Sequence, residues 1–202
     1  VIVNADFGYA MNKLVGNGIL RKWSPEKLAK KKYSSSTFML YLGLDKVYDQ
    51  PHHTFVFADD YRTNMSDIFE SHHLSDDMSV YVCNPSVTDK SLAPEGHSAL
   101  YMLVPVPNME AEIDWSKERK PYRDRVLRFL KERSPYTDLE EHIQEEVLIT
   151  PADWANGMNV YRGAPFNLAH TLRQLLVFRP RNKFEELDNC WLAGGGTNPG
   201  SG

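Results

Sequence analysis

A run of glycines near the end of the chain is the segment best able to approach a ligand. Cys190–Ala193 predicts a short strand, and Gly194-Gly195-Gly196-Thr197-Asn198-Pro199-Gly200 follows it directly. Because glycine has no Cβ, the backbone N–H groups of such a run can reach a phosphate or a ring system closely. The run has neither the lysine of a Walker A loop nor the spacing of a GxGxxG fingerprint. We therefore expect a ligand-binding loop, with a flexible tail as the alternative.

Histidine and cysteine are the other residue types that could carry chemistry. They are placed at His52-His53, His72-His73, Cys83 and Cys190. Neighbours in a strand point to opposite faces, so an adjacent histidine pair rarely holds one ion, and no HExxH motif occurs. The two cysteines lie in apolar runs, which favours core packing. We expect surface histidines, no metal site, and a reducing compartment.

The sequence gives little support for other classes of enzyme or for nucleic-acid binding. No GxSxG motif is present, and paired catalytic carboxylates cannot be chosen from the sequence, so no catalytic base is nominated. The 23 Lys+Arg and 27 Asp+Glu residues give a net charge of −4. This charge, with no RNP-like motif, argues against a nucleic-acid binder.

The hydrophobic pattern predicts strands and helices mixed throughout the chain, which indicates an α+β or mixed α/β fold. Predicted strands are Val1–Val3 (buried), Ser34–Leu44, His53–Phe57, Ser79–Cys83, Ser98–Val104 and Glu146–Thr150. Predicted helices are Trp23–Tyr33, Asp59–Ser71, Ser116–Arg133, one starting at Thr150, and Asn167–Phe178, in which Leu175–Phe178 could instead be a strand. No apolar run is long enough for a membrane-spanning helix.

Positive charge is concentrated in one segment. Residues 13–32 hold seven basic residues and one acid, so this segment carries +6 while the whole chain carries −4. The plain interpretation is a solvated surface. The alternative is a patch for anionic lipid headgroups, formed by Lys27, Lys30, Lys31 and Lys32, with Trp23, Leu28 and Tyr33 as interfacial anchors.

Several short strings, taken together, resemble the FAD-dependent carotenoid desaturases of the bacterial phytoene desaturase type. They are Val1–Asp6, Tyr41–Leu44, His52–Thr54, Val87–Asp89, Ser91–Gly96, Val104–Pro107, Thr150-Pro151, Asn159–Gly163, Arg179-Pro180 with Asn182, and Gly194–Gly200. Any one string alone is unspecific, but their order along the whole chain is that of the family. Asn198 is a departure, because many members carry histidine there.

The resemblance implies a two-domain flavoprotein, of which this chain is a C-terminal portion. Residues 1–10 and 188–202 would be edge segments of a Rossmann-like FAD domain, and residues 11–187 would be the substrate-binding domain. The GxGxxG half of the FAD domain is not in this sequence. We therefore expect that this polypeptide alone binds FAD poorly and is inactive.

The resemblance also implies an oxidoreductase reaction. A hydride leaves a long isoprenoid polyene for the flavin, a neighbouring proton is lost, and a new C=C bond forms, with the hard chemistry carried by the cofactor. The implied cofactor-binding residues are Asn4, Ala5, Asp6, Gly194, Gly195, Gly196, Thr197, Asn198, Pro199 and Gly200. The implied substrate residues are Phe38, Leu40, Leu42, Tyr161, Phe166 and Phe178, for each of which core packing is an equal alternative.

Because a carotenoid dissolves in membrane, the resemblance implies a cytoplasmic enzyme bound peripherally to the inner face of the membrane. Two other activities stay open. One is a carotenoid isomerase or retinol saturase on a similar flavin frame. The other is a non-catalytic carrier of apolar ligands.

Overall fold

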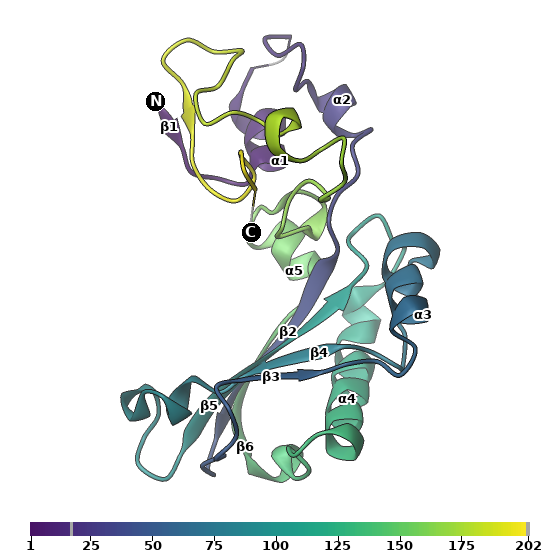
Figure 1. Cartoon of the computed structure of the whole chain (residues 1–202), viewed down its shortest axis with the longest axis vertical. Helices are drawn as coiled ribbons and strands as arrows, with labels where there is room; N and C mark the ends of the chain where they lie inside the picture. The colour runs from purple at the N-terminus through teal and green to yellow at the C-terminus, as the bar shows by residue number, and fades with distance from the viewer. Residues whose placement is uncertain (17, 201–202) are drawn as a thin grey trace. The chain divides into compact units, whose positions relative to one another are not determined.

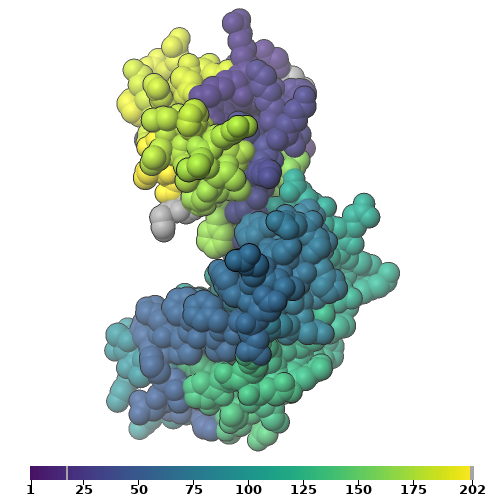
Figure 2. Space-filling model, turned by 45° about the vertical axis from the view of Figure 1, so that its right-hand side comes forward, coloured from purple at the N-terminus to yellow at the C-terminus, as the bar shows by residue number. Residues whose placement is uncertain are grey.

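The computed structural model describes residues 1–16 and 18–200, and the chain divides into two compact units. Unit 1 consists of Val1–Ser36 and Pro151–Gly202, and unit 2 of Thr37–Thr150. Within unit 1, the purple beginning of the chain packs beside its yellow-green end (Figure 2). These bounds differ from the expected segments 1–10, 11–187 and 188–202. The roles assigned to those segments stay predictions, and Asn17, Ser201 and Gly202 lie outside the described residues.

Unit 2 is built on a five-stranded sheet in the order β3-β4-β5-β2-β6. Its strands are β2 (Ser36–Leu44), β3 (His53–Val56), β4 (Val80–Cys83), β5 (Ser98–Val106) and β6 (Ile143–Ile149). The pairs β2–β6, β3–β4 and β4–β5 are antiparallel. Along β5, buried and partly exposed residues alternate, the pattern of a sheet covered by other structure on one face only. The predicted strands are confirmed, with their ends moved by a few residues.

One face of this sheet is covered by α4 (Trp115–Arg133), which runs along it (Figure 1). The Phe38 ring of β2 stacks on Trp115 at 5.8 Å between centroids and meets the edge of Tyr122 at 5.0 Å. The Asp114 carboxylate caps the helix by accepting the Ser116 N–H at 3.1 Å. The predicted helix 116–133 is confirmed. The helix predicted for residues 59–71 is also confirmed. It forms as α3 (Tyr61–Ser66), followed by a wider helical turn at Asp67–Ser71.

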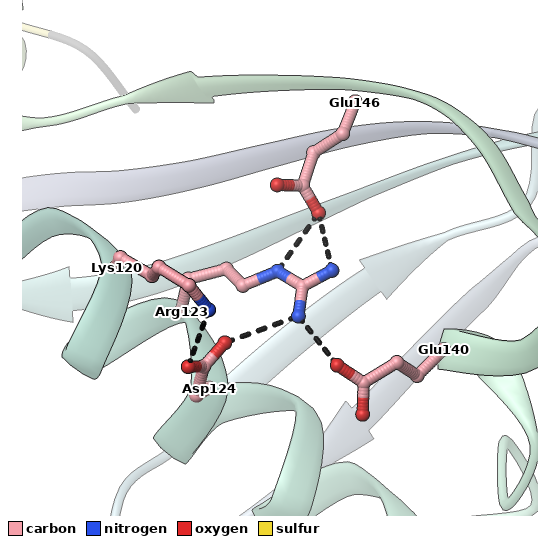
Figure 3. A network of polar contacts seen from close by, with 5 residues as sticks. All are labelled: Lys120, Arg123, Asp124, Glu140 and Glu146. Atoms are coloured by element: carbon pink, nitrogen blue, oxygen red, sulfur yellow. Dashed lines mark hydrogen bonds and ion pairs between the residues drawn. The ribbon is translucent and has the colours of Figure 1, made fainter.

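Arg123 of α4 ties this helix to the last strand of the sheet. Its Nε and Nη2 atoms both donate to one Glu146 oxygen at 2.9 Å, and Nη1 donates to Glu140 at 2.6 Å and to Asp124 at 3.1 Å (Figure 3). The Arg123 side chain is only 13% exposed, whereas Lys120, which binds Asp124 on the outside, is 80% exposed. Arg123 is therefore the shielded centre of the network.

Replacing Arg123 by alanine is expected to lower the free energy of unfolding by about 2–3 kcal/mol, because Glu146 loses the charged donors that compensate its partial burial. Lys120→Ala is the matched control and should change it by less than about 0.5 kcal/mol, as exposed pairs do. Urea unfolding followed by circular dichroism measures both. Equal effects of the two substitutions would contradict a shielded network.

Unit 1 is held together by short elements around one apolar cluster. Strand β1 (Ile2–Val3) pairs in parallel with β7 (Trp191–Leu192). The helices are α1 (Phe7–Tyr9), which continues as a wide turn Ala10–Leu14, α2 (Pro25–Leu28) and α5 (Pro151–Asn156). The cluster contains Phe7, Met11, Trp23, Leu28, Tyr33, Leu168, Phe184 and Leu192. The predicted mixture of helices and strands is thus confirmed in both units.

Three local predictions in unit 1 are wrong. The strand at Val1–Val3 forms, but Ile2 is 74% exposed, because β1 belongs to a sheet of two strands. The helix predicted for residues 23–33 ends at Leu28, and the chain then enters a bridge between Tyr33 and Leu168. Residues 167–178 form turns, neither helix nor strand except for one 3₁₀ turn. Asn167 (φ 63°) and Leu176 (φ 49°) are left-handed and interrupt any helix.

Within the described residues, no helix combines the length and the apolar content that crossing a bilayer requires.

Candidate functional site

The parallel pair β1–β7 places the two predicted cofactor segments side by side. The Ala193 N–H donates to the Val3 carbonyl at 3.0 Å, so Asn4–Asp6 leave β1 where Gly194–Gly200, here called the glycine loop, leaves β7 (Figure 1). A Cβ on Gly194 would lie 3.6 Å from the Asn4 side-chain oxygen. The structure therefore brings together residues separated by almost the whole chain. Their role in binding a cofactor stays a prediction.

Three glycines of the loop are constrained by its geometry, Gly194 by its φ of +117°. Gly200 has φ +119°, and a Cβ there would lie 2.9 Å from Nε of Arg179. A Cβ on Gly196 would lie 3.0 Å from the Phe7 Cβ. Thr197 between them is buried, and its hydroxyl donates to the Gly194 carbonyl at 2.9 Å. The loop is thus a packed turn in the described part of the chain, not the flexible tail that composition alone left open.

Asp6 links three separate segments of unit 1. One carboxylate oxygen accepts hydrogen bonds from the backbone N–H groups of Tyr9 (2.7 Å) and Tyr161 (3.1 Å). The other oxygen accepts a hydrogen bond from Nδ2 of Asn167 (2.7 Å). Burial raises the pKa of Asp6 above its usual range, and these hydrogen bonds oppose the rise. Asn167 also lies against Gly196, so Asp6 holds in place a side chain on which the glycine loop packs.

Arg179, which the sequence analysis named only within a family string and gave no role, also belongs to this site. Its side chain is completely buried, donating to the carbonyls of Leu168 (2.7 Å) and Gly195 (3.4 Å) and lying 3.2 Å from the His170 ring. Its Nε atom is buried without a partner, and no carboxylate binds the guanidinium in residues 1–16 and 18–200. Burial lowers the pKa of Arg179. A buried cation without an anion is costly.

These features fit a cofactor that carries negative charge. A phosphate or another anionic group at the glycine loop would supply the counter-charge that Arg179 lacks, and a guanidinium matches such groups well. Beside the loop lies a cavity of about 10 Å³, enough for one water molecule at most. It is lined by Val3, Ala5, Phe7, Ala10, Leu192, Ala193, Gly196 and Thr197. A large cofactor would therefore lie against the loop's outer surface, not in this cavity.

The six predicted substrate residues fall into two groups. Phe38, Leu40 and Leu42 share one side of β2 and are at most 3% exposed, in the core between the sheet and α4. Tyr161, Phe166 and Phe178 belong to unit 1. Tyr161 packs on Tyr33 at 5.1 Å between centroids, whereas Phe166 and Phe178 are 38% and 55% exposed. The structure does not bring the six together within one unit, and their contact with a polyene stays a prediction.

The opposite face of the same sheet carries a row of rings, here called the aromatic strip. It consists of Phe55, Tyr81, Tyr101 and Tyr41, one each from β3, β4, β5 and β2. Successive centroids are 5.0, 5.8 and 5.7 Å apart. The strip spans about 14 Å at ordinary strand spacing, and Phe55 is 62% exposed. Burial raises the pKa of Tyr81, so its hydroxyl is uncharged at neutral pH.

The basic segment has a different structure from the one expected. Lys27, Lys30 and Lys32 are exposed and Lys31 is partly so. Among the described residues no carboxylate forms an ion pair with any of these four, whereas Lys22 pairs with Glu185 at 2.7 Å. Trp23, Leu28 and Tyr33, expected as interfacial anchors, are instead in the core of unit 1, at most 4% exposed, because they supply its apolar cluster. That expectation is wrong. Leu14 and Ile19 are the exposed apolar side chains of this segment.

Comparison with known proteins gives relatives but no matching family model. The chain is 54% identical over 202 residues to the 4,4'-diapophytoene desaturase (4,4'-diapolycopene-forming) of Methylomonas sp. It is 43% identical over 206 residues to the all-trans-zeta-carotene desaturase of Myxococcus xanthus, and 37% identical over 204 residues to the phytoene desaturase (lycopene-forming) of Pseudescherichia vulneris. Each comparison covers 100% of this chain but only 40%, 39% and 41% of the relative. The chain therefore spans about two fifths of the length of these relatives.

Proposed function

Because this chain is related along its whole length to the carotenoid desaturases, we propose that the protein carrying it introduces C=C bonds into a long isoprenoid polyene, with FAD as the oxidant. The observation that carries the proposal is the 54% identity to a diapophytoene desaturase over all 202 residues. Bound FAD supplies a hydride acceptor, and loss of a proton from the adjacent carbon completes the new double bond. The remaining task for this chain is to bind and align the two reactants.

Unit 1 is proposed to hold part of the FAD. The glycine loop presents backbone N–H groups without intervening side chains. Asn167, held by Asp6, packs against the loop, and Arg179 supplies a buried positive charge beside it. Together these residues fix and neutralise an anionic group of the cofactor. Asn198 cannot transfer a proton near neutral pH, because an amide does not titrate there. Its Nδ2 instead donates to the Leu176 carbonyl at 2.7 Å, which orders the adjoining turn.

Unit 2 is proposed to hold a stretch of the polyene on the aromatic strip. A polyene has no hydrogen-bonding groups, so its binding needs apolar contact area and exclusion of water. Exposed Phe55 and Tyr41 at the ends of the strip, and partly exposed Tyr81 and Tyr101 between them, offer such a surface. Phe38, Leu40 and Leu42 support the strip from the other side of the sheet, because their side chains alternate with that of Tyr41 along β2.

The function is tested by supplying the purified, FAD-loaded protein with 4,4'-diapophytoene or phytoene in liposomes and separating the products. We expect new products with longer conjugated chromophores and fewer hydrogens. Products of unchanged mass but changed cis/trans geometry would support an isomerase instead. Tight polyene binding without any product would support a carrier, and either result would overturn the proposal.

We also propose that the protein reaches its substrate at a membrane surface through Lys27, Lys30, Lys31 and Lys32. Four lysines without ion-pair partners in the described residues leave their charge available to anionic headgroups. Leu14 and Ile19, 61% and 52% exposed, add apolar contacts from the same segment.

Changing these four lysines to glutamate is expected to weaken co-sedimentation with anionic liposomes at least tenfold at physiological salt, since each loses about 1 kcal/mol of attraction before screening. The control changes four basic residues of α4 to glutamate: Lys117, Lys120, Arg128 and Lys131. It alters the net charge equally and should leave most binding intact. Equal losses in both variants, or none in the first, would exclude this surface.

A further inference from the structure

Three residues of metal-binding types meet where β3 begins and β4 ends. His53 of β3 is paired in register with Cys83 of β4, so their side chains share one face of the sheet. His52 precedes β3, and its ring centroid is 4.3 Å from that of His53. The rule that adjacent strand residues point to opposite faces therefore does not separate this pair, because only one member lies in the strand.

The ligand atoms of this cluster lie about 1 Å further apart than those of a metal-bound site. One ligand atom each from His52, His53 and Cys83 lie within 4.8 Å of one another. Within the described residues this is the only group of three or more histidine, cysteine and acidic side chains that meets this condition. Tetrahedral zinc bonds of 2.0–2.3 Å need ligand atoms about 3.3–3.7 Å apart, so the side chains must close by roughly 1 Å.

Each imidazole also has a partner that orients it. Nδ1 of His52 lies 2.7 Å from the Thr88 hydroxyl, and Nδ1 of His53 lies 2.7 Å from the Tyr81 hydroxyl. When Nδ1 carries the proton and donates it to the hydroxyl oxygen, the Nε2 lone pair is left for a metal. Such outer partners are a regular feature of metal-binding histidines.

Two tyrosines share the face of the sheet on which Cys83 lies. Cys83 is buried, it is paired in register with Tyr101 of β5, and Tyr81 precedes it by two residues in β4. Both phenols can donate to a thiolate once a metal has displaced the thiol proton.

We propose that His52, His53 and Cys83 form a zinc site, with water in the fourth position. Binding removes the Cys83 proton to solvent and changes no oxidation state, so the step balances without a further reactant. Two nitrogens and one sulfur suit Zn²⁺ and other borderline-soft divalent ions, and exclude Mg²⁺ and Ca²⁺, which prefer oxygen. The zinc site shares Tyr81 and Tyr101 with the aromatic strip, but metal binding itself needs neither FAD nor polyene.

The test uses tag-free protein, stripped with a chelator and titrated with Co²⁺ as a spectroscopic probe. We expect the visible bands of tetrahedral cobalt, a thiolate-to-cobalt charge-transfer band, and release of the Co²⁺ by Zn²⁺. Cys83→Ser should abolish the charge-transfer band, and His52→Ala with His53→Ala should weaken binding at least tenfold. His72→Ala with His73→Ala, the other adjacent pair, is the matched control and should bind as the parent does.

Two results would overturn the zinc site. One is a parent protein whose cobalt spectrum lacks the charge-transfer band. The other is binding that falls as much in the His72/His73 control as in the His52/His53 variant. Circular dichroism of each variant keeps loss of fold separate from loss of ligands. His53 is exposed and Cys83→Ser changes one atom, so we expect all variants to fold.

Discussion

Replacing Arg179 by methionine is expected to weaken FAD binding by on the order of 100-fold. The guanidinium is fully buried against the glycine loop and has no carboxylate partner in the described residues. If an anionic group of FAD is its partner, the substitution removes one side of a buried charge pair, which costs about 2–5 kcal/mol, where each 1.4 kcal/mol is tenfold. Equilibrium dialysis or quenching of flavin fluorescence measures the change.

Two further variants separate charge from structure. Arg179→Lys keeps the charge but cannot reach the Leu168 and Gly195 carbonyls with a planar fork, so we expect partial recovery of FAD binding. Arg181→Met removes an exposed positive charge two residues away and should leave FAD binding unchanged. If Arg179→Met lowers the thermal unfolding temperature but binds FAD as the parent does, Arg179 serves the fold alone and this part of the proposal is wrong.

Replacing Phe55 by aspartate should lower kcat/KM for the polyene by about 10- to 100-fold. The change removes an apolar contact with the polyene worth about 1.5–3 kcal/mol, and it places a charge where the uncharged polyene binds. Because the Phe55 side chain is 62% exposed, the variant should fold and keep its flavin. Turnover is measured by the absorbance of the longer chromophore, with substrate delivered in liposomes.

Phe69 provides the matched control for this substitution. It is also a phenylalanine, 52% exposed, and it lies in the turn after α3 and not on the aromatic strip. Phe69→Asp should keep kcat/KM within about twofold of the parent. Equal losses for Phe55→Asp and Phe69→Asp would mean that the aromatic strip does not bind the substrate.

Strand β2 shows how far the sequence could lead. The Thr, Phe and Tyr within residues 34–44 favour a strand, and the strand is there. A strand has two faces, but its own residues do not say which one a helix covers. That depends on α4, about 75 residues further on, whose Trp115 and Tyr122 pack on Phe38. The exposed row through Tyr41 therefore became visible only in the structure.

A glycine-rich loop after a strand was predictable because its composition is unusual and local, whereas its ligand binding stays a prediction. The burial of Arg179 was not predictable, since an arginine is normally on the surface, and only the tertiary fold shows this one buried without an acid among the described residues. The helix predicted for residues 167–178 failed for a similar reason. The Gln174 side chain, near the centre of this segment, forms two hydrogen bonds with the backbone of Lys32 in a distant segment. This tertiary contact stabilises a non-helical backbone, and the local spacing of apolar residues does not reveal it.

We propose that FAD oxidises a polyene in the protein that carries this chain. The most direct measurement is anaerobic mixing of the FAD-loaded protein with diapophytoene or phytoene in liposomes, followed by the flavin absorbance. We expect the oxidised flavin band to bleach, with one new C=C bond formed per flavin reduced. A flavin that stays oxidised while products appear, or that bleaches without any new double bond, would contradict it.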